Sequence, residues 1–484
     1  MPYKLITSPF ITAPLPRQAG LRVFTMTLTC AFMLGGCAPW SPQSPARSGL
    51  AIPSDWSTSA ALAGDNSIAA AKTASSLAQW WQRFDDPLLA SLVTQALVAN
   101  TTVWSAQAAL QQARALRDVQ GANLLPSVSG NSSVERRRTS HNETSNNFRV
   151  GLDASWEPDI FGRQRNTLNA SEADALASQA SLGNVQVSVA AEVALAYIQL
   201  RGQQAQLLIA RNSLRSQQET LQITDWRAQA GLTTSLEVEQ ARTASEQTAA
   251  QIPTLQAAIA RSSHSLAVLT GQTPVALQAL VLAPQPIPQA ASELALAIPA
   301  QTLRQRPDLR AAELRVSAAL ARVSVADAAR YPSFSLSGSL GLNALTLGGL
   351  GNAGLASSLL GGIAVPLFDG GTARAQVLAQ EGALEQARAS YQGIVLTALK
   401  DVEDALSALQ GDRARLVRLQ NAATAAGDAD LLAQQRYASG LIDFQTVLQT
   451  QRALLSTQDS VATTRTDISA DHVRLYKALG GGWN

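Results

Sequence analysis

The chain has 484 residues, a net charge of +2, 15% charged residues and 5% aromatic residues. This composition is too apolar for a disordered chain and too polar for a helical membrane transporter. The one dense basic cluster, Arg136-Arg137-Arg138, is too short to bind nucleic acid and is expected to lie in a solvated loop.

The N-terminus has the pattern of a secretory leader. Arg17 and Arg22 precede an apolar run that ends in Leu-Gly-Gly before Cys37. This ending resembles the lipobox of bacterial lipoproteins, which implies cleavage before Cys37 and lipidation of its thiol. We therefore expect residues 1–36 to be a lipoprotein signal peptide and residues 37–79 to be a Pro/Ser-rich tether. Ala38 is compatible with an outer-membrane destination.

The rest of the chain contains an internal duplication. Leu125-Pro-Ser-Val recurs as Tyr331-Pro-Ser-Phe, 206 residues later, and the Arg-x-x-x-Gly-Leu motif at Arg227 recurs at Arg436, 209 residues later. A nearly constant offset through separate motifs indicates two repeats. We place them at residues 80–283 and 301–484, joined by a Pro-rich linker at residues 284–300.

Each repeat is expected to contain helix, strand, strand, long helix, turn and long helix. In the first repeat the helices are predicted over Leu88 to about Gly121, from Gly162 to about Gln229, and from about Thr234 to Leu269. The middle helix has a seven-residue apolar spacing that is typical of coiled coil; its members are Val193, Leu200, Leu207, Leu214 and Leu221. At about 1.5 Å per residue this helix would be about 100 Å long, which no compact globular domain contains.

The segments between the first two helices of each repeat alternate with a period of two. Phe334, Leu336 and Leu340 alternate with serines, as do Val150, Leu152 and Trp156 with small or polar residues. Such strands suit a membrane β-barrel with lipid outside and water inside. Four strands cannot close a barrel, and edges exposed to lipid are costly, so copies of the chain must share one barrel. Two copies would give eight strands and three would give twelve; only the larger ring is expected to leave a usable channel.

No constellation in the sequence points to catalysis, a metal or a cofactor. A Gly-x-Gly-x-x-Gly match at Gly349 lies between two predicted strands with no helix to hold a phosphate. The three histidines are scattered, and the acidic residues around Asp401 have no partner nucleophile. We therefore expect a protein that is not an enzyme and uses no metal or cofactor.

Five ordered stretches resemble the TolC-like outer-membrane efflux proteins, in particular the lipoprotein subgroup of resistance-nodulation-division (RND) pumps. They are Trp80-Trp-Gln-Arg-Phe-Asp-Asp-Pro-Leu88, Trp156-Glu-Pro-Asp-Ile-Phe-Gly-Arg163, Arg306-Pro-Asp-Leu-Arg-Ala-Ala-Glu313, Pro366-Leu-Phe-Asp-Gly-Gly371, and Arg436-Tyr437 through Gly440 to Asp443. The resemblance implies a mainly α protein in which a homotrimer forms a periplasmic α-helical barrel continuous with a 12-stranded outer-membrane β-barrel. It also implies lipid anchoring in the outer membrane, a periplasmic adaptor and an inner-membrane RND transporter as partners.

The resemblance further implies a gate at the periplasmic turns. The matching positions make Arg436, Tyr437 and Asp443 the main candidates, with Gln449, Arg227 and Glu237 beside them. The family often has acidic residues where this chain has Thr446 and Gln449, so strong cation selectivity is not expected. Asp443→Ala or Tyr437→Phe should raise single-channel conductance. The alternatives to a drug efflux channel are the outer-membrane channel of a type I protein secretion system and a coiled-coil lipoprotein without a pore.

Overall fold

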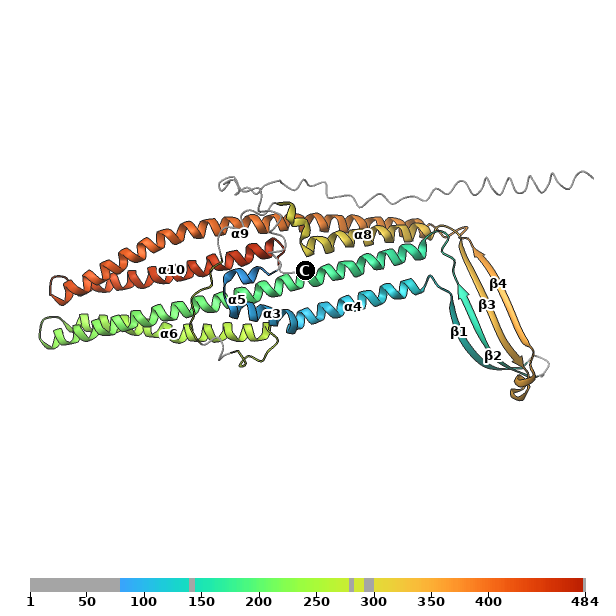
Figure 1. The fold of residues 1–484 in the computed structure, drawn as a ribbon, viewed down its shortest axis with the longest axis horizontal. Helices are drawn as coiled ribbons and strands as arrows, with labels where there is room; N and C mark the ends of the chain where they lie inside the picture. Colours follow the sequence, from blue (N-terminus) through green and yellow to red (C-terminus); the bar gives the residue numbers. More distant parts are fainter. Residues whose placement is uncertain (1–78, 139–143, 278–282, 291–299, 482–484) are drawn as a thin grey trace, which may run out of the picture. The chain divides into compact units, whose positions relative to one another are not determined.

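The computed structural model describes residues 79–138, 144–277, 283–290 and 300–481. The expected leader, Cys37 and nearly all of the tether lie outside these residues. Within them, each repeat has the predicted order of elements (Figure 1). The short 3-10 helices are η2 (Trp80–Phe84), η4 (Ala300–Gln305) and η5 (Leu347–Asn352).

The first helix of repeat one differs from its prediction, because it is two helices, α3 (Pro87–Ala99) and α4 (Thr101–Ala122), bent by 41°. Asp86 caps α3 by accepting from the backbone of Leu88 and Leu89. Asn100 ends that helix and caps the next, since its side-chain oxygen accepts from Thr102 N at 2.8 Å. Its amide also donates to the Leu269 carbonyl, 169 residues away, which fixes the bend.

The two long helices of the first repeat end at the predicted residues, Gln229 and Leu269. The elements are α5 (Arg163–Gln229), α6 (Ser235–Leu269), α8 (Pro307–Ala328), α9 (Thr372–Ala438) and α10 (Phe444–Ala478). Gly162 and Gly371, with φ of 81° and 88°, precede α5 and α9 in the left-handed conformation that glycine adopts readily. The pairs α5–α6 and α9–α10 form two long hairpins (Figure 1).

The main core surrounds the middle of α5. Val193 and Leu200, two of the predicted heptad positions, are fully buried there, together with Val402 and Leu409 of α9, which stand 209 residues after them. Trp80 of η2 stacks on Tyr476 of α10 at 5.5 Å, and both side chains are buried in this core. By length and composition α5 is apolar enough to cross a membrane, but half of its most apolar stretch is buried in the protein, as in a core helix.

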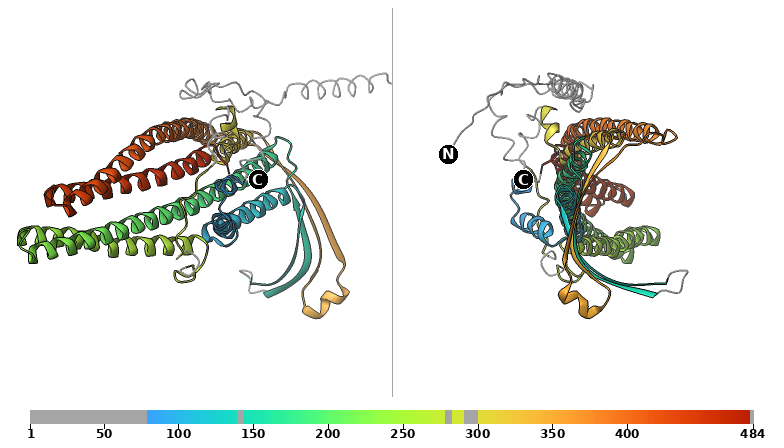
Figure 2. Two further views of the ribbon diagram at one scale, coloured as in Figure 1. Left: turned by 60° about the vertical axis from the view of Figure 1, so that its left-hand side comes forward. Right: turned by 90° about the vertical axis from the view of Figure 1, so that its right-hand side faces the viewer.

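The strands form one antiparallel sheet in the order β1-β2-β3-β4 at the end of the long helices away from their turns (Figures 1 and 2). They are β1 (Ser127–Arg138), β2 (Thr144–Trp156), β3 (Ser333–Ala344) and β4 (Leu355–Ala364). The middle pair joins the two repeats, with Leu152 opposite Leu340 and Trp156 opposite Leu336. The arginines at 136–138 belong to β1 and extend its ladder to β2, so the loop expected there is wrong, although they are exposed as expected.

The two faces of the sheet differ in polarity as the alternation predicted. Residues directly opposite one another share a face. One face carries Val128, Val134, Phe148, Val150, Leu152, Trp156, Phe334, Leu336, Leu340, Leu342, Leu355, Leu359 and Ile363. The other carries mainly serine and charged residues, with Leu360 as an exception: Ser127 Oγ lies 2.9 Å from Ser155 Oγ, and Arg149 pairs with Asp153 at 3.3 Å.

Candidate functional site

The two helical hairpins end in turns of the same geometry. In the first, Leu232 N donates to the Arg227 carbonyl at 2.8 Å; in the second, Leu441 N donates to the Arg436 carbonyl at the same distance. Gly231 and Gly440 occupy the left-handed position, with φ of 71° and 75°. Both turns are therefore Schellman-type helix ends, which fixes the exit direction of the next helix.

Tyr437 anchors the second turn in a small apolar cluster. Its ring is buried and makes an edge contact with Phe444 at 5.9 Å. The buried cluster also contains Ala241 and Ala244 of α6, and Val447 and Leu448 of α10. Residues of both hairpins thus enclose this tyrosine, so the cluster ties the two hairpins together near their turns.

Arg227 of the first hairpin strengthens this junction by polar contacts. Its guanidinium carbon lies 4.6 Å from the centre of the Tyr437 ring, a cation–π arrangement, and Nη1 donates to the Tyr437 carbonyl. The Tyr437 hydroxyl lies 3.2 Å from Thr224 Oγ1, which itself donates to the Thr220 carbonyl at 2.8 Å. We call Arg227, Thr224 and Tyr437 the turn latch, because they join α5 to the end of α9.

The remaining gate candidates lie outside the turn latch. Arg436 and Gln449 are exposed, and Glu237 accepts a hydrogen bond from Thr233 within its own turn. Asp443 caps α10: Oδ1 accepts from the Thr446 hydroxyl at 2.7 Å and from Thr446 N at 2.9 Å, and these bonds lower the pKa of its carboxyl. The roles of these four residues in a gate stay predictions.

Sequence reasoning missed a row of polar contacts that continues from the turn latch along the hairpins. Gln451 Nε2 donates to Thr220 Oγ1 at 2.9 Å, and Gln206 donates to Thr463 at 3.1 Å. Asp430 is buried in the same region and accepts from Gln434 at 2.8 Å; burial raises the pKa of its carboxyl. A buried face made of Thr, Gln and Ser at helical spacing was the signal for this row, and it lies within the predicted helices.

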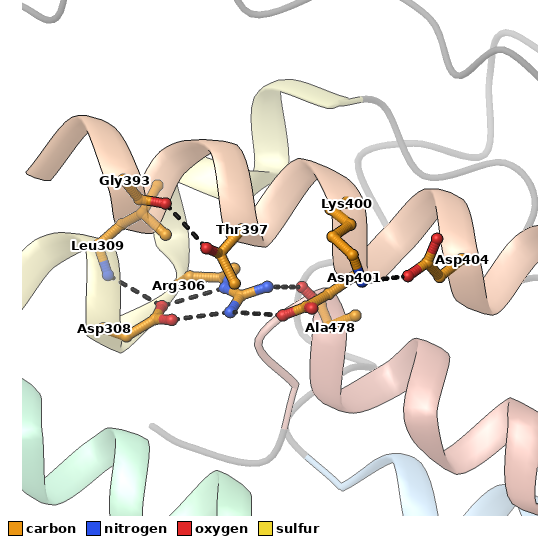
Figure 3. Close-up of polar contacts among 9 residues, drawn as sticks. All are labelled: Arg306, Asp308, Leu309, Gly393, Thr397, Lys400, Asp401, Asp404 and Ala478. Carbon is orange, nitrogen blue, oxygen red and sulfur yellow. Dashed lines mark hydrogen bonds and ion pairs between the residues drawn. The ribbon is translucent and has the colours of Figure 1, made fainter.

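The Arg306 motif forms a second polar cluster, where the start of α8 meets α9 and the end of α10 (Figure 3). Arg306 is nearly buried and pairs in a bidentate manner with Asp308, at 2.7 and 3.0 Å. Its Nη1 donates to the Ala478 carbonyl at 2.7 Å, and Asp401 lies 3.7 Å from Nη2. Arg306 therefore fastens the start of α8 to α9 and to the end of α10.

The described residues hold no group of three or more His, Cys, Asp or Glu side chains placed to bind a metal ion. His472 is buried between α9 and α10, where it lies 3.2 Å from Arg413, and burial lowers its pKa. The acidic residues of α9 pair locally: Asp404 lies 2.5 Å from Lys400, and Asp401 faces Arg306. These groups have structural partners in the fold.

Comparison with known proteins connects this arrangement to one family. The sequence profile of the outer membrane efflux protein family matches residues 92–272 and 298–481. The chain is 32% identical over 472 residues to the pyoverdine export outer membrane protein OpmQ of Pseudomonas aeruginosa, covering 94% of this chain and 96% of that one. It is 33% identical to the solvent efflux pump outer membrane protein SrpC of Pseudomonas putida, covering 95% and 98%.

Solved structures agree with the sequence relatives. The fold matches that of the outer-membrane channel OprN with a TM-score of 0.84, 35% identity, and coverage of 90% of this chain and 98% of that one. It matches the outer membrane protein VceC of Vibrio cholerae with a TM-score of 0.78 at 26% identity, covering 84% and 99%. The chain therefore belongs to the outer membrane efflux protein family.

Proposed function

We propose that this outer-membrane efflux channel subunit forms a homotrimeric passive conduit in a tripartite RND-type pump. Three copies contribute four strands each to a twelve-stranded barrel, and their long helices continue it as a tube through the periplasm. A periplasmic adaptor and an inner-membrane RND transporter complete the pump. The chain catalyses no reaction and needs no cofactor.

The observation that carries this proposal is the polarity of the four-stranded sheet. Its apolar side chains gather on one face and are largely exposed, while the opposite face presents serines and the Arg149–Asp153 pair. In water such an apolar face would be unfavourable, at about 25 cal/mol per Å² of apolar surface. In a barrel it faces lipid, and the serine face lines a water-filled passage.

Targeting completes the proposal at the N-terminus. Residues 1–36 are removed as a signal peptide, and Cys37 is acylated at the start of a tether over residues 37–79. An anchor with two or three acyl chains holds a protein on a membrane far better than one chain does. The two repeats, 80–283 and 301–484, with the linker 284–300 between them, then form the channel body.

The turn latch is the gate in this proposal. While it is closed, Arg227 and Thr224 of the first hairpin hold Tyr437 of the second, so both hairpins of one chain stay together. Opening separates the α9–α10 turn from α5. The adaptor shifts the population toward that state by binding it better than the closed one.

The cargo is a small organic compound in this proposal. The relatives are named for export of pyoverdine and for efflux of solvents, toluene and antibiotics. Their common element is a small molecule, which favours efflux over the alternative of type I protein secretion. We propose that the inner-membrane transporter selects the compound, because a serine-lined passage offers no specific pocket.

Two measurements test the proposal together. The purified, lipidated protein should form ion-conducting pores in planar bilayers, and deletion of its gene should increase susceptibility to organic solvents or antibiotics. A protein without conductance would be the non-pore lipoprotein instead. A conducting protein whose deletion abolishes secretion of a polypeptide and leaves drug susceptibility unchanged would be the secretion channel.

A further inference from the structure

The three arginines at the end of β1 divide between the two faces of the sheet. Arg137 lies on the same face as Glu135, and its Nη2 pairs with a Glu135 carboxylate oxygen at 2.9 Å. Arg136 and Arg138 lie on the face with most of the apolar side chains, which we call the apolar face, because alternate residues of a strand point to opposite sides. Both are exposed, and neither forms an ion pair with an acidic residue that the structure describes.

The two faces of the sheet also differ in how their charges are balanced. The polar face carries two acidic and two basic residues among the described strand positions, which are Glu135, Asp153, Arg137 and Arg149. The described strand positions of the apolar face include no acidic residue, and their only charged side chains are Arg136 and Arg138. These two like charges stand about 7 Å apart along one strand. An anion placed between them from outside the chain would remove their mutual repulsion.

The depth of the two arginines follows from the register of β1 and β2. Strand β1 ends, and β2 begins, at the end of the sheet away from the long helices (Figure 1). The residues opposite Arg136 and Arg138 are Asn146 and Thr144. They precede Trp156, the last residue of β2, by ten and twelve positions. Since a membrane strand rises about 3.4 Å per residue and tilts by about 45°, ten and twelve positions span about 24 and 29 Å of membrane thickness.

This span matches the apolar band of a membrane barrel, which is about 25 Å tall and is flanked by aromatic side chains at its boundaries. Trp156 lies on the apolar face and marks the boundary near the helices. Val134 and Phe148, which lie opposite one another, are the last apolar pair before the arginines. Arg136 therefore lies at the other boundary of the band, and Arg138 lies just beyond it, at the depth of lipid headgroups.

We propose that Arg136 and Arg138 bind the phosphate group of an anionic lipid in the outer leaflet of the membrane. The inference rests on the proposed channel, in which the helices lie in the periplasm and the far end of the sheet reaches the outer surface. A guanidinium group donates two parallel hydrogen bonds to a phosphate, a geometry that the ammonium group of lysine does not offer. Two arginines on one face provide two such groups for one headgroup.

A lipid suits this place better than a soluble anion because the arginines continue an apolar surface. Val134, Val150 and Leu152 lie between them and the helices and are 71%, 48% and 51% exposed. The acyl chains of a lipid cover this surface while its phosphate contacts the arginines, whereas a soluble anion contacts the arginines alone. The Asn146 amide and the Thr144 hydroxyl share the same face and offer further hydrogen bonds to the headgroup.

Native mass spectrometry of the purified, lipidated protein in detergent tests the site with lipid A, a phosphorylated glycolipid, as the probe. A basic side chain at an anionic membrane surface contributes about a fivefold factor to a binding constant. Arg136→Gln/Arg138→Gln should therefore weaken the binding of lipid A by about 25-fold. Dephosphorylated lipid A with the same acyl chains should bind equally to the variant and to the wild type. Inorganic phosphate in large excess should leave lipid A bound.

Arg137→Gln is the matched control, because it removes one positive charge from the adjacent position on the polar face. It should change the binding of lipid A less than about twofold, whereas Arg136→Gln alone should weaken it about fivefold. Arg136→Lys/Arg138→Lys keeps both charges and loses the planar guanidinium groups, so its binding should lie between that of the wild type and that of the double glutamine variant.

The outcomes separate this site from the channel itself. Equal effects of Arg137→Gln and Arg136→Gln, or equal binding of lipid A and its dephosphorylated form, would overturn the site. Displacement of lipid A by inorganic phosphate would also overturn it, because the arginines would then bind soluble anions. Conductance in planar bilayers alongside any of these results would leave the channel proposal intact. A protein that neither conducts ions nor binds lipid would overturn both.

Discussion

Tyr437→Phe tests the turn latch by removing a single hydroxyl group. Thr224 donates its own proton to the Thr220 carbonyl, so Tyr437 must be the donor in their 3.2 Å contact. The phenylalanine variant loses that hydrogen bond and keeps the ring, its edge contact with Phe444 and the cation–π contact with Arg227. It leaves no buried donor unpaired, so the effect is that of one hydrogen bond.

The magnitude follows from the number of copies. A neutral hydrogen bond of this kind contributes about 0.5–1 kcal/mol net. Three copies in one ring would lose about 1.5–3 kcal/mol from the closed state, and ~1.4 kcal/mol corresponds to a factor of ten in an equilibrium constant. The closed-to-open ratio should therefore shift by roughly tenfold to a hundredfold toward the open state.

Single-channel recording in planar bilayers measures this shift as open probability. Thr224→Val removes the same bond from the other side, so the double variant should add little to either single variant. Tyr331→Phe is the matched control, because Tyr331 stacks on Phe161 beside the sheet, far along the chain from the turn. An open probability of Tyr437→Phe within twofold of the wild type, with Thr224→Val equally silent, would refute the latch.

Three other perturbations address stability and targeting. Arg306→Ala removes a buried bidentate pair and the bond to the Ala478 carbonyl, so the free energy of unfolding should fall by about 2–4 kcal/mol. Thermal unfolding in detergent measures this loss. Arg310→Ala, at an exposed position, is the control and should change the free energy of unfolding little. Burial raises the pKa of Asp430 above 3.8, so the folded protein binds this proton more tightly and loses stability as the pH rises through the raised pKa. Asp430→Asn should therefore unfold at a higher temperature than the wild type at pH 7, with a difference that vanishes as the pH falls below 3.8. Asp428→Asn, at an exposed position of the same helix, is the control for the loss of one carboxylate. Cys37→Ser should abolish labelling by radioactive palmitate, and retained labelling would place the lipid elsewhere.

The parts of the fold predictable from sequence are those fixed by local signals. Gly162 before α5 and Gly231 after it mark that helix because each adopts a positive φ at a helix end. The period-two alternation predicted which strand residues share a face of the sheet. The β2–β3 register places apolar residues of one repeat opposite apolar residues of the other. The break at Asn100 could not be seen in the same way, because its amide bonds to Leu269, 169 residues away.

The candidate site was predictable in part, for a similar reason. Tyr437 and Arg227 were chosen from motifs at the turns, and the structure brings those two into contact. Thr224 was missed because a threonine inside a helix carries no signal of its own; its role depends on the hydroxyl that faces it from another hairpin. Asp443 was selected by its place in the motif, and its visible contacts serve to cap α10.

Because of the duplication, the two turns have the same backbone geometry but different side chains. Their two arginines should therefore differ in how strongly they hold the turns closed. The offset of 209 residues between the repeats relates Arg227 to Arg436, but it relates Tyr437 to Ala228. Arg227 therefore has the aromatic ring of Tyr437 to stack on. The residue that the repeat relation places opposite Arg436 is Ala228, whose side chain is a methyl group. A cation–π contact contributes about 0.5–2 kcal/mol, and a hydrogen bond from a charged donor about 1.5–3 kcal/mol.

Arg227→Ala should accordingly raise the open probability much more than Arg436→Ala, although both remove one positive charge from equivalent turns. Because the net charge change is the same, a difference between the two variants reports the latch and not a general electrostatic effect on ion entry. Equal effects, or a larger effect of Arg436→Ala, would mean that the contact between neighbouring copies holds the turns closed and that the contact within each chain does not.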